Sequence, residues 1–249
     1  MNGFSKAVSA IVMGCILFGF VGGAVAQPFS PYRHYSSSLF VNGNLKLFFQ
    51  KQWRARVLAS SGASMEGPTA PQVQLPLSVS SFRTVSAPIM PKRLAAGVPD
   101  LDEAQRQELE NSFLEMLKGY EQLLDTRDES QLRNSLAGAF NYLFMSSYYV
   151  LKNGQELTEE QRESMLEQIN TGIGLGLKER RMSDRDKQEL YEAVVLSGSL
   201  ILGLYNEGRD KGRPEQMKTA RELARDLLEQ MMGITLDKVH VNGGSVRVE

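Results

Sequence analysis

The part of the chain after residue 99 contains two long stretches without a charged residue, AGAFNYLFMSSYYV at residues 137–150 and AVVLSGSLILGLY at residues 193–205. Each lies inside a longer run whose apolar residues recur every three or four positions, which is the spacing of a helix. A helix that is apolar on nearly all of its sides is stable in water only where other elements cover it. We therefore predict that these two segments form the central helices of a bundle.

Amphipathic segments on either side of this pair predict the rest of the bundle. Apolar residues recur at helical spacing over residues 109–124, 165–169 and 217–231. Helix start signals, and a stop at the last helix, accompany the periodic segments: Asp100 with Glu103, Asp128 with Gln131, Thr158 with Gln161, Ser183 with Asp186, Pro214 and Gly233. The predicted fold class is mainly α, a bundle of about five helices within a helical domain at residues 99–249.

Two glycine-containing segments interrupt the helical pattern. The tail VHVNGGSVRV, residues 239–248, alternates around Asn242-Gly243-Gly244 and predicts a short C-terminal β-hairpin. The segment GIGLG at residues 172–176 lacks the preceding strand of a dinucleotide-binding loop and the Lys-Ser pair of a phosphate-binding loop. We interpret it as a flexible helix end followed by a turn.

Residues 1–26 have the pattern of a secretory signal peptide. Lys6 precedes an apolar run that ends in Ala24-Val25-Ala26, the small residues that signal peptidase requires. One alternative is a transmembrane anchor, but four glycines dilute the apolar run. Another is lipoprotein processing at Cys15, which would leave only a short apolar stretch before the cysteine. We expect cleavage near Ala26, export from the cytoplasm, and a mature chain without cysteine.

Residues 27–98 are rich in serine and proline and predict an extended, partly disordered N-terminal arm. Residues 73–75 and 77–79 are candidate edge strands within it. A denser stretch, LKLFFQKQWRARVL at residues 45–58, mixes aromatic and basic side chains. Its apolar residues do not share one helix face, which favours packing on the main domain over a membrane-surface helix or a nucleic-acid patch. The residues of the arm that we predict to contact a partner or a membrane are Phe48, Phe49, Trp53, Arg54 and Arg56.

The residues that usually perform catalysis or bind metals are scarce. The chain has two histidines, His34 and His240, and neither stands at metal-ligand spacing from another histidine or a cysteine. A net charge of −1 gives no general attraction to nucleic acid. Five glutamates at residues 156, 159, 160, 163 and 167 fit a solvated helix face better than an acid–base pair of a hydrolase. We predict no catalytic, cofactor-binding or metal-binding residue.

Small residues stand at intervals along both central segments. They are Gly138, Ser146, Ser147, Ser197, Gly198, Ser199 and Gly203. Such residues allow two helices to approach closely, and this is the interpretation we favour. The alternative is a narrow slot between the two helices for an apolar or lipid-like ligand.

Several short motifs resemble a known family. They are Ser81-Phe82-Arg83, Met90-Pro91, Leu94-Ala95, FLEMLKGY at residues 113–120, DKQELYE at residues 186–192 and GITLD at residues 233–237. Together they resemble a family of exported bacterial helical proteins catalogued only as a domain of unknown function, over residues 81–248. The resemblance implies a Gram-negative source and a periplasmic or secreted product, and it brings no catalytic residues.

Three functions follow as hypotheses from these observations. The first, which we favour, is a non-enzymatic interaction protein whose arm docks an envelope or extracellular protein, with a membrane surface as a weaker contact. The second is a carrier for an apolar ligand between the central helices. The third, which the scarcity of histidine and cysteine disfavours, is a carboxylate-dependent hydrolase.

Overall fold

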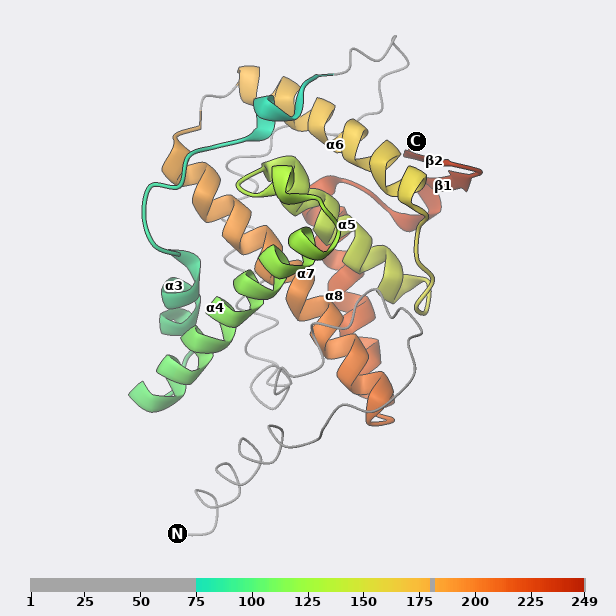
Figure 1. Cartoon of the computed structure of the whole chain (residues 1–249). Helices are drawn as coiled ribbons and strands as arrows, with labels where there is room; N and C mark the ends of the chain where they lie inside the picture. Colours follow the sequence, from blue (N-terminus) through green and yellow to red (C-terminus); the bar gives the residue numbers. More distant parts are fainter. Residues whose placement is uncertain (1–74, 180–181, 249) are drawn as a thin grey trace.

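The computed structural model describes residues 75–179 and 182–248, which form a helical bundle with a C-terminal hairpin (Figure 1). The elements in chain order are α3 (Met90–Gly97), α4 (Glu103–Thr126), α5 (Leu136–Leu151), α6 (Glu159–Glu179), α7 (Asp184–Asp210), α8 (Pro214–Met232), β1 (Val239–Asn242) and β2 (Ser245–Val248). Short 3-10 helices lie at Leu77–Ser80, Ser130–Leu132 and Leu236–Lys238. The predicted fold class is confirmed.

The two uncharged stretches are the centre of the bundle, as predicted. Apart from Asn141 and Leu151, every residue of α5 is buried, and α7 is buried without interruption over residues 191–202. Helices α5 and α7 pack against each other, α8 packs on both, α6 covers α5, and α4 lies against α7. The apolar side chains of all these helices form one continuous core.

Two of the predicted helix starts are confirmed by their hydrogen bonds. At α6 the Thr158 hydroxyl accepts from the Gln161 N–H, and the Gln161 side chain accepts from the Thr158 N–H. Ser183 and Asp186 form the same reciprocal capping box at α7. Pro214 begins α8, and Gly233, in the left-handed conformation, ends it.

The predicted starts at Asp100 and Asp128 were wrong, by two and by seven residues, for a backbone reason. An N-cap residue needs an extended conformation, but Asp100 and Asp128 have positive φ angles of 61° and 55°. The cap of α4 is instead Asp102, which forms a capping box with Gln105. The cap of α5 is Ser135, whose hydroxyl accepts from the Gly138 N–H.

The structure corrects the interpretation of residues 75–98 as part of an extended arm. Phe82, Met90, Leu94 and Val98 are buried in the common core. Residues 77–80 form a 3-10 helix where residues 77–79 were expected to be an edge strand. Pro91 lies in the first turn of α3, where proline is tolerated. The segment from residue 75 onward therefore belongs to the helical unit.

The glycine-rich segment at residues 172–176 lies inside α6, so the predicted helix end and turn were wrong. The physical reason is close packing at Gly174. A methyl group at that position would lie 2.7 Å from Leu75 Cδ1 and 2.8 Å from Val79 Cγ2. The absence of a side chain therefore lets the 3-10 helix at Leu77–Ser80 lie directly on α6.

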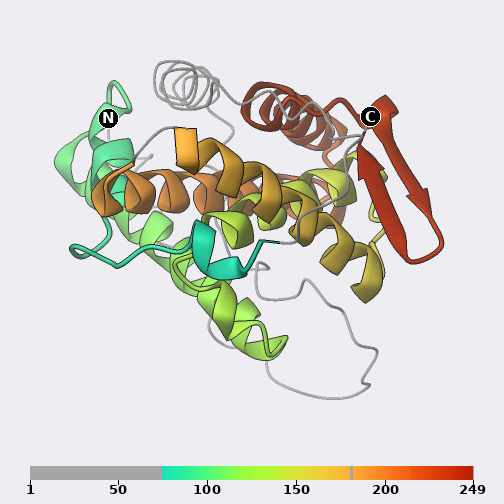
Figure 2. The same ribbon diagram turned by 90° about the horizontal axis from the view of Figure 1, so that it is seen from above.

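The C-terminal hairpin is present and lies at one edge of the bundle (Figure 2). Its register pairs Val241 with Val246 around the two-residue turn Gly243-Gly244. Val246 is completely buried, and its carbonyl oxygen accepts from Gln168 Nε2 of α6 at 2.5 Å. Gln161 Nε2 donates to the Gly243 carbonyl at 2.6 Å, so α6 holds the hairpin at both its turn and its second strand.

Candidate functional site

The aromatic and basic residues predicted to contact a partner lie outside the described residues. Phe48, Phe49, Trp53, Arg54 and Arg56 all precede residue 75. Their role stays a prediction. Over the described residues, no helix is long and apolar enough to span a membrane.

The seam between α5 and α7, the predicted place for an apolar ligand, is closely packed where its glycine lies. A methyl group at Gly198 would lie 2.9 Å from two ring carbons of Tyr142. The Tyr142 hydroxyl is 3.2 Å from Ser199 Oγ, and the two groups form a buried hydrogen bond. Ser197 donates back to the Ala193 carbonyl within its own helix. Small residues here bring the two helices together.

The glutamates that a hydrolase would need are spread along an exposed face. Glu159, Glu160, Glu163 and Glu167 of α6 are all exposed, as expected for a solvated helix face. In the part of the chain that the structure covers, no three His, Cys, Asp or Glu side chains gather where a metal ion could bind.

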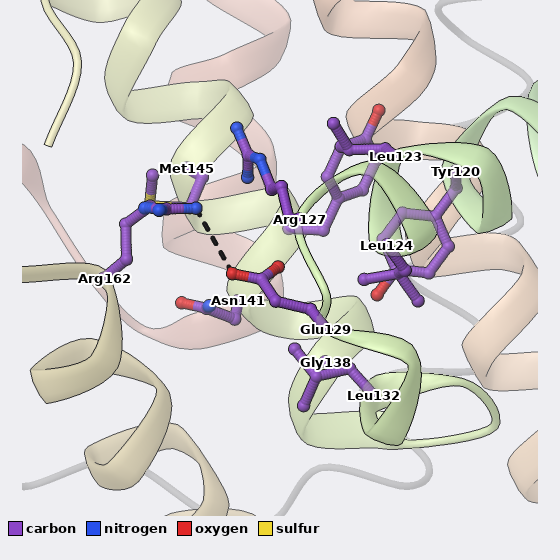
Figure 3. Close-up of a pocket in the computed structure, with 11 residues that line it drawn as sticks. Tyr120, Leu123, Leu124, Arg127, Glu129, Leu132, Gly138, Asn141, Met145 and Arg162 are labelled. Atoms are coloured by element: carbon purple, nitrogen blue, oxygen red, sulfur yellow. Dashed lines mark hydrogen bonds and ion pairs between the residues drawn. The ribbon is translucent and has the colours of Figure 1, made fainter. Parts of the chain in front are cut away.

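A small polar pocket lies where the C-terminal end of α4 meets α5 and α6 (Figure 3). Its volume is about 20 Å³, which is room for about one water molecule. The lining residues come from α4, from the connection to α5, from α5 and from α6: Tyr120, Leu123, Leu124, Arg127, Glu129, Leu132, Gly138, Asn141, Tyr142, Met145 and Arg162. Polar and charged side chains therefore meet an apolar wall in one small space.

Tyr120 lies at the buried side of this pocket. Its ring continues the apolar stripe of α4 and packs against Tyr142, with ring centroids 4.7 Å apart. Burial raises the pKa of the Tyr120 hydroxyl well above its usual value, and the neighbouring Tyr191 and Tyr142 add to this effect. The hydroxyl therefore stays protonated and can donate a hydrogen bond.

Charged groups lie together on one side of the pocket (Figure 3). Arg162 Nη1 donates to Glu129 Oε1 at 3.3 Å. Burial, and then the charge of Arg162, lower the pKa of Arg127. Burial raises the pKa of Glu156, while the charges of Arg127 and Arg162 oppose that rise. Two guanidinium groups and the Glu129 carboxylate thus line the pocket together with the buried Tyr120 phenol, and the charge of Glu156 acts on both arginines.

Sequence reasoning did not identify this pocket. Arg162 lies among the glutamates whose pattern predicts a solvated helix face, and Tyr120 lies within the periodic apolar segment at residues 109–124. Asn141 offered the one available signal, because it is the only amide side chain in the uncharged stretch 137–150. A polar side chain in such a stretch must find a partner or line a polar space.

Comparisons with known proteins give a family but no described function. The model of a family of unknown function, DUF6683, matches residues 6–249. No curated protein and no solved structure matches the chain.

Proposed function

The chain belongs to the DUF6683 family of unknown function, and from its own residues we propose that it is an exported, non-enzymatic interaction protein. In this proposal the signal peptide directs export, and the helical unit from residue 75 onward is a scaffold. The scaffold carries an N-terminal segment that docks an envelope or extracellular protein. The docking residues are Phe48, Phe49, Trp53, Arg54 and Arg56.

The observation that supports this proposal most is the fixed attachment of the chain at residue 75. The side chain of Asn170, 2% exposed on α6, donates from Nδ2 to the Leu75 carbonyl at 2.8 Å. It also lies 3.4 Å from the Pro76 carbonyl. The contact of Leu75 and Val79 with Gly174 secures the same point. The residues before 75 are therefore joined to a rigid unit at a defined place, which suits a scaffold that presents a recognition segment.

The composition of the segment supports a protein partner. Aromatic and arginine side chains contribute most of the binding energy at many protein interfaces. Phe48, Phe49, Trp53, Arg54 and Arg56 place five such side chains within nine positions of the chain. We assign the docking function to these five together.

Affinity capture from solubilised envelope proteins tests the proposal. The bait is the mature protein beginning at Gln27, compared with a variant in which Phe48, Phe49 and Trp53 are alanine. The control variant replaces Lys46 and Lys51 by glutamine, which alters charge in the same stretch but removes none of the proposed contacts. We expect the aromatic variant to lose its partner and the control to retain it. Equal capture by all three proteins would refute the docking role.

Export is tested separately, by N-terminal sequencing of the protein recovered from cells. We expect the native product to begin at Gln27, directly after Ala24-Val25-Ala26. A product that keeps Met1 and remains with the membranes would refute export as a cleaved protein.

A further inference from the structure

We propose that the pocket between α4, α5 and α6 binds a small hydroxycarboxylate. The first reason is a pair of buried polar atoms. Tyr120 Oη and Asn141 Oδ1 are buried, and neither has a hydrogen-bond partner among the described residues. A buried polar group without a partner is costly, so such groups in a native protein indicate an occupant. Tyr120 and Asn141 both line the same small pocket (Figure 3).

Gly138 makes room for the Tyr120 hydroxyl. A methyl group at residue 138 would lie 3.2 Å from that oxygen and 2.8 Å from the Leu132 carbonyl. The space around the hydroxyl therefore depends on the absence of a side chain at this position of α5.

The second reason is the pair of guanidinium groups. Arg127 and Arg162 both line the pocket, and a guanidinium matches a carboxylate with a planar fork of donors. The one hydrogen bond of the Arg162 side chain within the described region goes to Glu129 at 3.3 Å. That distance exceeds the ~2.8 Å of a strong charge-assisted bond. Glu129 is 29% exposed and Arg162 18% exposed, so the Glu129 carboxylate can move into water and leave its place to a ligand.

The third reason is size and hydrogen-bond complementarity. The pocket has room for about one water molecule, and departure of the Glu129 carboxylate would free the volume of one carboxylate more. In the proposal, this combined space holds a carboxylate joined to one hydroxyl group. A hydroxyl can donate to Asn141 Oδ1, which a carboxylate alone cannot, while the Tyr120 hydroxyl can donate to either part of the ligand. Glycolate is the smallest probe with both groups, and acetate is the matched probe without the donor.

The proposal is tested by titrating the mature, ¹⁵N-labelled protein with glycolate at constant ionic strength. The side-chain signals of Asn141, Arg127 and Arg162 are followed by NMR. We expect saturable shifts of these signals and tighter binding of glycolate than of acetate. Absence of saturation up to about 100 mM, where even a weak specific site would fill, would overturn the proposal. Equal affinity for the two probes, or tighter binding of inorganic phosphate, would overturn the ligand class.

Substitutions separate binding from a purely structural role. Glu129→Gln removes the competing carboxylate, so glycolate should bind about threefold to fivefold more tightly, the size of a partly exposed ion pair. Arg162→Gln should weaken binding at least about tenfold, as for loss of a charge-assisted bond. Arg133→Gln is the control, because Arg133 pairs with Asp125 outside the pocket and should leave affinity unchanged. Unchanged or weaker binding of glycolate by Glu129→Gln would refute the displacement of the Glu129 carboxylate by the ligand. This result does not depend on whether Arg162→Gln folds well.

Discussion

Replacing Glu192 by alanine should loosen the segment at residues 85–97 from the bundle. Glu192 lies on α7 and is 4% exposed. Its Oε2 accepts the backbone N–H groups of Ile89 at 2.7 Å and Met90 at 2.8 Å, where α3 begins. Its Oε1 accepts from Gln188 Nε2 at 2.7 Å. One carboxylate thus holds the start of α3 against the central helix.

The cost of this substitution can be estimated from the bonds it removes. A hydrogen bond to a charged acceptor contributes about 1.5–3 kcal/mol, so the two bonds to α3 contribute about 3–6 kcal/mol. Removal of the carboxylate also relieves its own desolvation, which is the main cause of the raised pKa of Glu192. We therefore expect Glu192→Ala to lower the free energy of unfolding by about 2–4 kcal/mol. Glu192→Gln retains an acceptor for α3 but turns an amide NH₂ toward Gln188, so we expect a loss of about 1 kcal/mol.

Urea unfolding followed by circular dichroism measures these losses, and hydrogen exchange localises them. The amides of Ile89 and Met90 should exchange much faster in Glu192→Ala than in the wild type. Glu189→Ala is the control, because its partners Arg93 and Arg185 are 37% and 62% exposed and each such pair contributes less than about 1 kcal/mol. The reasoning is refuted if Glu192→Ala costs no more than Glu189→Ala, or if the exchange of the two amides is unchanged.

Three further predictions concern the core, the hairpin and pH. Gly198→Ala should destabilise the protein by about 1–3 kcal/mol because the methyl group meets Tyr142. Gly203→Ala, with no neighbour within 4 Å, should stabilise α7 by up to about 1 kcal/mol. Thermal melting temperatures of the two variants equal to that of the wild type would contradict both predictions. Val246→Ala should lower the protection of the β1 and β2 amides from hydrogen exchange by releasing the hairpin from α6; unaltered protection would contradict this. Because burial raises the pKa of Glu192 in the folded state, the native chain keeps the Glu192 carboxyl protonated to higher pH than the unfolded chain does. The stability advantage of wild type over Glu192→Gln should thus shrink as pH rises above the ordinary glutamate pKa of 4.5, and a constant advantage would contradict this.

The bundle could be predicted from the sequence because its strongest signals are local. An uncharged stretch longer than three helical turns has no solvated side, so residues 137–150 and 193–205 could only be central. The caps at Thr158 and Ser183 depend on residues three apart, which a sequence pattern captures directly. The glycines at 172–176 misled the same reasoning, because their effect depends on a distant segment. Gly174 accommodates Leu75 and Val79, and nothing within the local pattern indicates that contact.

The polar pocket could not be predicted because its parts come from separate elements. Tyr120, Arg127, Asn141 and Arg162 lie on α4, on the loop after it, on α5 and on α6. Each has an ordinary explanation in its own segment, as a core aromatic residue, a loop cation, a helix amide or a surface cation. Only the packing of three helices makes them neighbours.

The most direct test of the docking role uses the only tryptophan of the chain, Trp53. Its fluorescence reports on the proposed recognition segment without a label and without interference from the helical unit. The mature protein is titrated with solubilised envelope proteins, and its emission and its quenching by iodide are recorded. The emission of the envelope proteins alone is measured separately and subtracted. Docking predicts a saturable shift of the emission to shorter wavelength and protection from iodide, both because the indole leaves water. Emission and quenching that stay unchanged across the titration would contradict the central claim that this segment binds a partner.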